Sequence, residues 1–507
     1  MKRITYWLVF ICCLTDIQTV QSQIQKKEES HPGQNAEAVK IEAWITNADR
    51  SSLFEKQSEE LSFSTRDSRR GTAIVIDDGQ PLQSIDGFGF ALTGGSAELM
   101  MKMSATERSK LIHELFETDG KNVGISYIRL SIAASDLNSF VYSYNDLAEG
   151  ETDLPLAKFG LSQDLNDVIP VMKEILAINP KIKILASPWS APKWMKTNHN
   201  VRGGSLKPEC YDVYARYLVK YIQAMNKVGI TIDAITVQNE PLNSNNTPSM
   251  QWLPNEQKDF IKNNLGPEFR KANITAKIIL FDHNLDRIDY PLTTLYDPEV
   301  AKYVDGSGFH HYGGDFSAMT TLHTAYPDKH LYFTEQMVVE KPGSPTIDIA
   351  AQVKRLIIGA SRNWSRNVIL WNLAADPLND PHTDNGGCSM CQGALTLDGD
   401  KVSRNLAYYT IVHASKFVRP GSVRITSTGK GDNAVSLTDD EERQGSVRVT
   451  VIENADVLPN VAFKTPEGKI VLIVANDSHA VNSFRIQYNG QFANLRLSPG
   501  AVGTYIW

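Results

Sequence analysis

The chain has few cysteines, no long apolar run and no block of like charge, and these absences exclude several classes of protein. Its 507 residues include five cysteines, too few for a disulfide scaffold. The net charge of −7 is spread along the chain, so nothing indicates nucleic-acid binding or an acidic tail. No apolar stretch is long enough to span a bilayer. With 42% hydrophobic and 21% charged residues, the composition is that of a globular protein with a large core.

The first residues predict a secretory signal peptide over residues 1–22. Lys2 and Arg3 precede an apolar run over residues 6–14, and a cleavage site fits after Ser22. We therefore expect the mature protein to be secreted, periplasmic or held at the cell surface. An N-terminal core helix is the alternative structural interpretation of the same segment.

The cysteines allow two further interpretations. A lipoprotein anchor at Cys12 or Cys13 is an alternative to the cleaved peptide, although the residues before them lack the expected small side chains. Cys388 and Cys391 form a lone C-x-x-C pair, whereas a structural zinc site needs four ligands. In a secreted protein we expect this pair to form a local disulfide or two free thiols, and we expect no metal.

A repeating alternation of strands and helices begins near residue 84 and predicts a (β/α)8 TIM barrel over residues 84–412. The competing architecture is an open doubly wound sheet, which would show a G-x-G-x-x-G loop after its first strand. The stretch GFGFALTGG lacks that spacing. The eight expected strands span residues 84–93, 125–133, 181–190, 233–240, 276–284, 306–313, 330–337 and 367–374.

Short alternating runs separated by Gly, Asn and Asp fill residues 413–507 and predict an antiparallel β-sandwich. The polar residues 23–38 predict a flexible linker. Residues 39–83 contain the strand-like run VKIEAWIT, which has no neighbour of its own. We expect this N-terminal segment to join the C-terminal sandwich.

Two glutamates end strands of the predicted barrel and suggest its chemistry. Glu240 follows the run AITVQN and precedes Pro241, and Glu335 ends the seventh strand. Barrel enzymes place catalysis at this end of their strands, so the two carboxylates can face each other. A glycosidase needs such a pair, and a separation of roughly 5 Å implies retention of configuration. Since Asn239 can bind a sugar 2-OH beside Glu240, we expect Glu240 to be the acid/base and Glu335 the nucleophile.

Other expected strand ends carry residues that suit a sugar. Sugar rings stack on aromatic side chains, and polar edges bind their hydroxyls. Arg129 could keep the nucleophile ionised by charge and hydrogen bonding. Core packing is the alternative role for any single aromatic, and His310 and His311 could be metal ligands, although no third ligand has a suitable spacing. Besides Arg129 and Asn239, the candidate substrate-binding residues are Trp189, His310, Tyr312 and Trp371, with Trp194 near them.

The stretches GFGFALTGGSA, YIRLSIAASDLN, ILASPWSAPKWMKTN, VQNEPLN, GFHHYGGDF, FTEQ and LWNLAADP resemble the glucosylceramidase-related enzymes of glycoside hydrolase family 30. The resemblance implies a TIM barrel with a β-sandwich built from both chain ends. It also implies retaining hydrolysis of β-glycosidic bonds without a cofactor. It places Glu240 as acid/base and Glu335 as nucleophile, with Arg129, Trp189, Asn239, Tyr312 and Trp371 around the sugar.

One departure from the family bears on the substrate. Glucosylceramidases carry an aspartate after the stretch that matches GFGFALT, where this chain has Gly94. We therefore expect a cavity left open beside Gly94, with Trp189 and Trp194 facing solvent along a glucan chain. The main hypothesis is a monomeric, secreted endo-β-1,6-glucanase of the bacterial type. The alternatives are a glucosylceramidase and a non-catalytic carbohydrate-binding protein, the latter disfavoured by the presence of both glutamates.

Overall fold

The computed structural model describes residues 38–66, 72–341, 343–428, 434–439, 447–452 and 457–507. The predicted signal peptide, the alternative anchor at Cys12 or Cys13 and all but the last residue of the predicted linker lie outside the described residues. Within the described residues, no helix combines the length and the apolar character that a membrane crossing requires.

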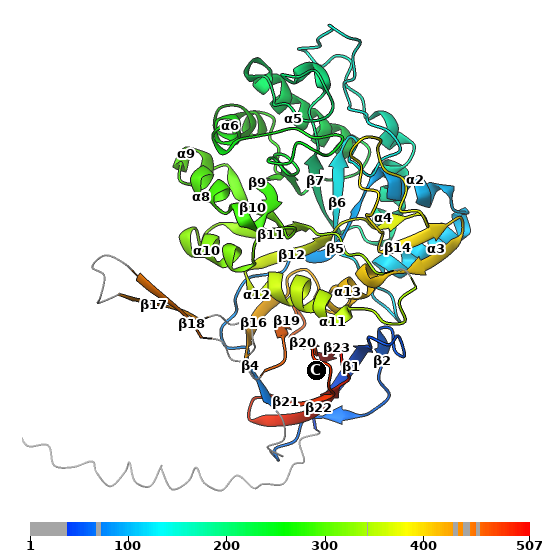
Figure 1. The fold of residues 1–507 in the computed structure, drawn as a ribbon, viewed down its shortest axis with the longest axis vertical. Helices are drawn as coiled ribbons and strands as arrows, with labels where there is room; N and C mark the ends of the chain where they lie inside the picture. The colour runs from blue at the N-terminus through cyan, green and yellow to red at the C-terminus, as the bar shows by residue number, and fades with distance from the viewer. Residues whose placement is uncertain (1–37, 67–71, 342, 429–433, 440–446, 453–456) are drawn as a thin grey trace, which may run out of the picture. The chain divides into compact units, whose positions relative to one another are not determined.

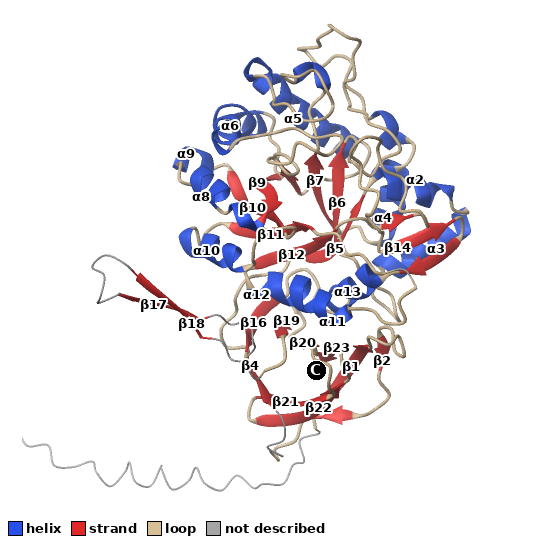
Figure 2. Cartoon of the chain, viewed as in Figure 1, coloured by secondary structure: helices blue, strands red, loops and turns tan. Residues whose placement is uncertain are grey.

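Eight parallel strands close into a barrel, as Figures 1 and 2 show. The ring closes where Asn367–Leu370 of the last strand pairs with Gly87–Phe90 of the first. Most strand residues are buried, as expected for parallel strands covered on both faces. The predicted (β/α)8 barrel is confirmed. Its strands are β5 (Gly87–Leu92), β6 (Tyr127–Ile132), β7 (Lys183–Pro188), β8 (Ala234–Thr236), β9 (Lys277–Asn284), β10 (Val304–His310), β11 (His330–Glu335) and β12 (Ser365–Leu370).

Helices follow the barrel strands and cover their outer face (Figure 2). Ser104 caps the N-terminus of α3, where its hydroxyl accepts a hydrogen bond from the backbone N–H of Glu107. α11, a π-helical stretch Val353–Gly359 and α12 follow one another without a break. The helices are α2 (Gly94–Lys102), α3 (Ala105–Phe116), α4 (Val168–Ile178), α5 (Tyr211–Lys227), α6 (Pro254–Phe260), α7 (Gly266–Lys271), α8 (Asp289–Leu295), α9 (Pro298–Ala301), α10 (Ser317–Ala325), α11 (Ile349–Gln352), α12 (Ala360–Arg362) and α13 (Leu406–Ser415).

The remaining large sheet combines both ends of the described chain. β1 pairs antiparallel with β23, so the expectation that VKIEAWIT joins the C-terminal sandwich is confirmed. β4 pairs antiparallel with β16 but parallel with β21, so the sandwich is not wholly antiparallel. Its strands are β1 (Lys40–Thr46), β2 (Glu55–Lys56), β3 (Leu61–Ser62), β4 (Thr72–Asp77), β16 (Val423–Ser427), β19 (Asn460–Lys464), β20 (Ile470–Ala475), β21 (Asn482–Tyr488), β22 (Gln491–Leu497) and β23 (Val502–Ile506).

Two small sheets complete the described structure. β17 (Ala434–Asp439) and β18 (Val447–Ile452) pair with each other in a sheet of their own, although the sequence placed both runs in the sandwich. A second sheet contains β13 (Ala374–Ala375), β14 (Leu395–Asp398) and β15 (Lys401–Arg404), and follows the last barrel strand. The segment between β13 and β14 contains Cys388 and Cys391.

A buried histidine links α13 to the two chain ends. The His413 ring lies 2.8 Å from the Thr46 hydroxyl through Nε2 and 2.9 Å from the Thr504 hydroxyl through Nδ1. Thr46 ends β1 and Thr504 lies in β23, so one side chain joins the barrel helix to both strands. Burial lowers the pKa of His413 to about 3, because the charged ring would lose its hydration.

Replacing His413 with Gln should reduce the acid sensitivity of the fold. The folded pKa of about 3 lies below the ordinary value of 6.5, so the unfolded chain binds more protons between these values. Wild-type stability should therefore fall as pH drops from 6.5 towards 3, and the Gln variant should lose this contribution. Urea unfolding at pH 7.5, 6 and 4.5 measures how the free energy of unfolding changes with pH in the wild type and in the variant. Parallel slopes in wild type and variant would mean that His413 does not stay neutral in the fold.

Candidate active site

Glu335 and Glu240 meet at the carboxyl end of the barrel. Glu335 is the last residue of β11. β8 ends at Thr236, not at residue 240 as predicted, and Glu240 follows in a left-handed conformation with φ 46°. Its backbone N–H donates to the carbonyl of Asp282 at 3.0 Å, which fixes this unusual turn. A carboxyl oxygen of Glu240 lies within 4.8 Å of one from Glu335.

Both carboxyls open into a cavity of about 450 Å³. The cavity wall includes four of the predicted sugar-binding residues, Trp189, Asn239, Tyr312 and Trp371. The two indole rings stack on each other with centroids 5.3 Å apart and planes inclined by 25°. Trp189 and Trp371 therefore form a packed aromatic pair in the cavity wall that contains the two carboxyls.

Arg129 lies beneath this cavity and is completely buried. Its guanidinium donates to Glu335 Oε2 at 2.6 Å, to Asn239 Oδ1 at 2.7 Å and to Asp282 Oδ2 at 2.8 Å. Burial raises the pKa of Asp282, but the Arg129 charge outweighs this effect and the pKa lies well below its usual range. Asp282 was not predicted as a site residue, although a carboxylate within the apolar run AKIILFDHN was a signal of the same kind as Glu240.

His310 lies under the two glutamates and is not part of the cavity wall. Its Nδ1 is 3.4 Å from Glu240 Oε1 and 3.6 Å from Glu335 Oε1, and its Nε2 is 3.1 Å from Asp282 Oδ1. Burial lowers the pKa of His310, but the surrounding carboxylates raise it to about 9. The structure thus places this predicted sugar-binding residue as a positive charge supporting the carboxyls.

Glu240 and Glu335 have different hydrogen-bond partners. Glu240 Oε2 accepts from the side-chain amides of Asn243 at 2.7 Å and Asn246 at 3.2 Å, two residues that sequence reasoning missed. Glu335 Oε1 accepts from the Tyr312 hydroxyl at 3.0 Å. Only Glu335 is bonded to the Arg129 guanidinium among these two carboxyls.

The pKa values of the two carboxyls move in opposite directions. Burial raises the pKa of Glu240, but its contacts with His310 outweigh burial and lower the pKa to about 2. Burial also raises the pKa of Glu335, and the Glu240 charge adds to it, so the net shift is upward. Since the groups interact strongly, their protons belong to the cluster of Glu240, Glu335 and His310 as a whole.

Glu240, His310 and Glu335 also have the composition of a metal site. Each offers one ligand atom, and the three atoms lie within 4.8 Å of one another. A metal would need the unprotonated imidazole. With its pKa raised to about 9, His310 is protonated at neutral pH, and this opposes metal binding.

Asp136 is a third carboxyl in the cavity, and the expected opening beside Gly94 is not present. It follows β6, is almost wholly buried and lines the cavity with Glu240 and Glu335. Burial, with the charges of those two glutamates, raises its pKa to about 8. A Cβ on Gly94 would lie only 1.8 Å from Asn138 Nδ2, so the Asn138 side chain fills the space beside Gly94. The opening expected beside Gly94 is therefore closed by Asn138.

The expectation of solvent-facing tryptophans is wrong. Trp189 is 1% exposed and Trp194 is 5% exposed. The Trp194 indole N–H donates to Asn145 Oδ1 at 2.9 Å, and the ring is not part of the cavity wall. Trp194 therefore packs under the loops, which is the alternative role that the sequence left open.

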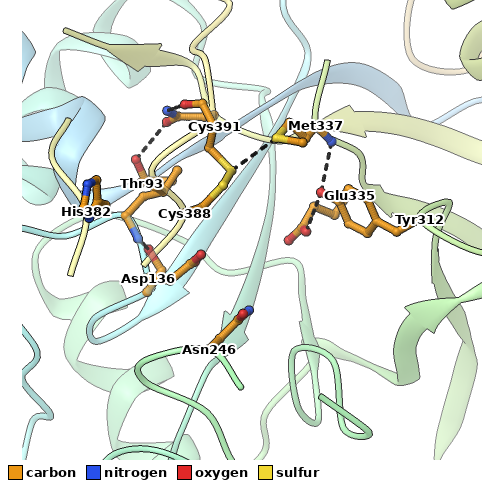
Figure 3. Close-up of a disulfide and its surroundings, with 12 residues drawn as sticks. Thr93, Asp136, Asn246, Tyr312, Glu335, Met337, His382, Cys388 and Cys391 are labelled. Carbon is orange, nitrogen blue, oxygen red and sulfur yellow. Dashed lines mark hydrogen bonds between the residues drawn. A yellow bond between two sulfur atoms is a disulfide. The ribbon is translucent and has the colours of Figure 1, made fainter. Parts of the chain in front are cut away.

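The C-x-x-C pair is a disulfide at the cavity. Cys388 and Cys391 are bonded, which selects the first of the two expected states, and both line the cavity wall. Figure 3 shows this disulfide between Asp136 on one side and Glu335 with Tyr312 on the other. Cys210 is a buried free cysteine.

Comparisons with known proteins match nearly all of the described chain. Residues 85–418 match the glycosyl hydrolase family 30 TIM-barrel domain, and residues 445–505 match the glycosyl hydrolase family 30 beta sandwich domain. The endo-1,6-beta-D-glucanase of Neurospora crassa is 35% identical over 86% of this chain and 93% of its own length. The lysosomal acid glucosylceramidase of Mus musculus is 29% identical over 86% of this chain and 84% of its own. The solved structure of the endo-beta1,6-glucanase BT3312 superposes with a TM-score of 0.80 at 30% identity, covering 92% of this chain and 99% of that one.

Replacing Asp136 with Asn should stabilise the protein increasingly as pH rises. The folded pKa of about 8 exceeds the ordinary value of 3.8, so the folded state holds a proton that the unfolded chain has lost. Wild-type stability should decline from about pH 4 to about pH 8, and the Asn variant should not show this decline. Measuring Tm at pH 5, 6.5 and 8 gives the difference in thermal stability between the wild type and the Asn variant at each pH.

The exposed residue Asp384, replaced with Asn, controls for the loss of one negative charge. A difference in Tm between the Asp136 variant and wild type that stays constant over this pH range would show that Asp136 is not protonated in the fold.

Proposed function

The chain belongs to glycosyl hydrolase family 30, and on that premise we propose that it cleaves β-1,6-linked glucan internally with retention of anomeric configuration. The protein is a glycoside hydrolase. The observation that carries the proposal is the pair of carboxyl oxygens within 4.8 Å of each other in one cavity. Retaining enzymes hold their carboxyl groups about 5–5.5 Å apart, and inverting enzymes hold them about 6.5–9.5 Å apart.

Glu335 is the proposed nucleophile. Arg129 and Tyr312 both donate to its carboxyl oxygens and orient the group. Burial and the Glu240 charge shift the pKa of Glu335 upward overall, whereas the Arg129 charge favours the ionised form. In the first step Glu335 bonds to the anomeric carbon while the bond to the leaving oxygen breaks. The product is a covalent glycosyl-enzyme.

Glu240 is the proposed acid/base. It faces the cavity and accepts hydrogen bonds from two neutral amides, while contacts with His310 outweigh burial and lower the pKa of its carboxyl to about 2. We assign it as the acid/base because Arg129 bonds to Glu335 and not to Glu240. Its Oε1 lies 3.4 Å from the protonated His310, and the two groups together hold the proton that the leaving oxygen needs. In the second step Glu240 takes a proton from water, the water oxygen bonds to the anomeric carbon, and Glu335 is released.

Asn239 is the proposed partner of the sugar 2-OH. Its Oδ1 accepts from Arg129 at 2.7 Å, so its Nδ2 remains to donate towards the cavity. Trp189 and Trp371 provide the aromatic surface against the sugar, and Asp136 the carboxyl for further hydroxyls. Asp136 stays protonated to about pH 8, so it can both donate and accept a hydrogen bond.

The choice of β-1,6-glucan rests on the relatives. The Neurospora crassa protein and BT3312 are both described as endo-1,6-glucanases and match this chain over most of its length. Glucosylceramide is the second candidate substrate, because Asp136 supplies a cavity carboxyl and a mouse glucosylceramidase is 29% identical. Secretion belongs to the same proposal and is supported by the pattern of residues 1–22.

The two glutamates should fail in different ways. Glu335→Ala should abolish turnover of every glycoside, because no covalent intermediate can form. Glu240→Ala should slow substrates with poor leaving groups by about 10²–10⁴-fold, while an activated aryl β-glucoside should still form the glycosyl-enzyme. Added azide should then release a β-glucosyl azide from the Glu240 variant, detectable by mass spectrometry and NMR.

Glu149→Ala changes an exposed glutamate and should keep wild-type rates on both substrates. A β-azide product from the Glu335 variant, with none from the Glu240 variant, would reverse the two roles.

The products should distinguish the candidate substrates. An endo-acting enzyme cuts inside the chain, so early digests of β-1,6-glucan should contain oligosaccharides rather than glucose alone. Chromatography of the first few per cent of the digest measures this distribution. Release of glucose only, or rapid cleavage of glucosylceramide with none of β-1,6-glucan, would replace the glucanase proposal with a glucosylceramidase.

A further inference from the structure

Three sulfur-containing side chains form one part of the cavity wall, and none of them has a role in the proposed reaction. Cys388, Cys391 and Met337 all line the cavity, and the Cys391 Sγ lies 3.4 Å from the Met337 Sδ. Figure 3 shows the three side chains together, with Asp136 and Glu335 on either side of them. This sulfur wall is apolar, whereas Asp136, Glu240 and Glu335 make other parts of the same cavity strongly polar.

The wall is fixed by the segments around it. The backbone N–H of Thr383 donates to the Asp136 carbonyl at 2.9 Å, and the N–H of Thr247 donates to the Gly386 carbonyl at 3.3 Å. The Asn372 side chain donates to the Cys391 carbonyl at 3.3 Å. The disulfide then closes the short loop between its two cysteines. The wall is therefore preorganised, and binding a ligand against it costs little ordering entropy.

We propose that the Cys388–Cys391 disulfide and Met337 contact a glucopyranose ring of the substrate and set the affinity of the enzyme for it. The proposal rests on the proposed glycosidase function. A pyranose presents hydroxyls at its edge and C–H groups on its faces, so a site needs both polar and apolar surfaces. Asp136 offers the polar partner and the sulfur wall offers the apolar one, and both line the same cavity.

The wall should act on binding and not on the chemical step. Met337 touches Tyr312 through its backbone N–H, which donates to the Tyr312 oxygen at 3.0 Å. Side-chain changes in the wall keep this bond, and with it the Tyr312 bond to Glu335. A contact made equally in the bound substrate and in the transition state changes KM and leaves kcat unchanged.

Reduction of the disulfide tests this contact. Dithiothreitol would be oxidised to its cyclic disulfide as the Cys388 and Cys391 thiols form, and alkylation with mass spectrometry counts those thiols. The buried Cys210 is already a thiol, so the reductant does not change it. Reduction should raise KM for a β-1,6-gluco-oligosaccharide about tenfold, with kcat changed by less than about twofold.

The double variant Cys388→Ser/Cys391→Ser isolates the effect. It should show the raised KM of the reduced wild type and no response to dithiothreitol. An unchanged KM in fully reduced wild type would overturn the proposal. A fall in kcat with KM unchanged would also overturn it, because the disulfide would then act on Glu335 through Tyr312.

Met337→Ala keeps the disulfide and the backbone hydrogen bond to Tyr312. This variant tests the sulfur wall if the reduced protein or the double variant unfolds. It should raise KM in the same direction, and an unchanged KM would count against the wall. Failure of the untreated enzyme to cleave any glycoside is a separate outcome, which rejects the proposed function. In that case calorimetric binding of the oligosaccharide, with and without reductant, still tests the wall, and equal affinities would reject it.

Discussion

The buried guanidinium of Arg129 is the interaction on which the site depends. A charge without solvent is costly unless it is paired and hydrogen-bonded, and Arg129 is bonded to Glu335, Asp282 and Asn239. These residues come from β11, from β9 and from the segment after β8, while Arg129 itself lies in β6. One side chain thereby sets the relative positions of groups on four parts of the barrel mouth. Removing it would leave the buried carboxylates of Glu335 and Asp282 with His310 as their neighbouring cation.

The carboxylates that Arg129 holds in place also determine the charge of His310. His310 is held between Asp282 and the two glutamates and stays positive to about pH 9. At neutral pH the proton of this cluster lies on His310, beside Glu240. The carboxyl of Glu240 is itself ionised, because its pKa is lowered to about 2. The raised pKa of Asp136 follows from its burial beside Glu335 and Glu240, and it lowers the stability of the fold as pH rises.

The barrel, and the meeting of Glu240 and Glu335 in one cavity, could be predicted because parallel strands buried on both faces appear as apolar runs. The two glutamates stand out at or just after the ends of such runs. Asp136 was not predicted as a cavity residue, because its position depends on a loop held by Thr383, which is far away in sequence and donates its backbone N–H to the Asp136 carbonyl. The direction of Trp194 was missed for the same reason: an indole in a loop packs inward or outward according to partners such as Asn145, which the local sequence does not reveal. The early end of β8 likewise follows from tertiary hydrogen bonds.

The central claim is that Glu335 and Glu240 work as nucleophile and acid/base across one cavity. Proton NMR of a β-1,6-gluco-oligosaccharide digest, recorded within the first minutes before mutarotation, tests it most directly. Two successive displacements at the anomeric carbon restore its configuration, so the β-anomer of the new reducing end should be observed first. If the α-anomer is observed first, the enzyme inverts, and a covalent intermediate on Glu335 is ruled out.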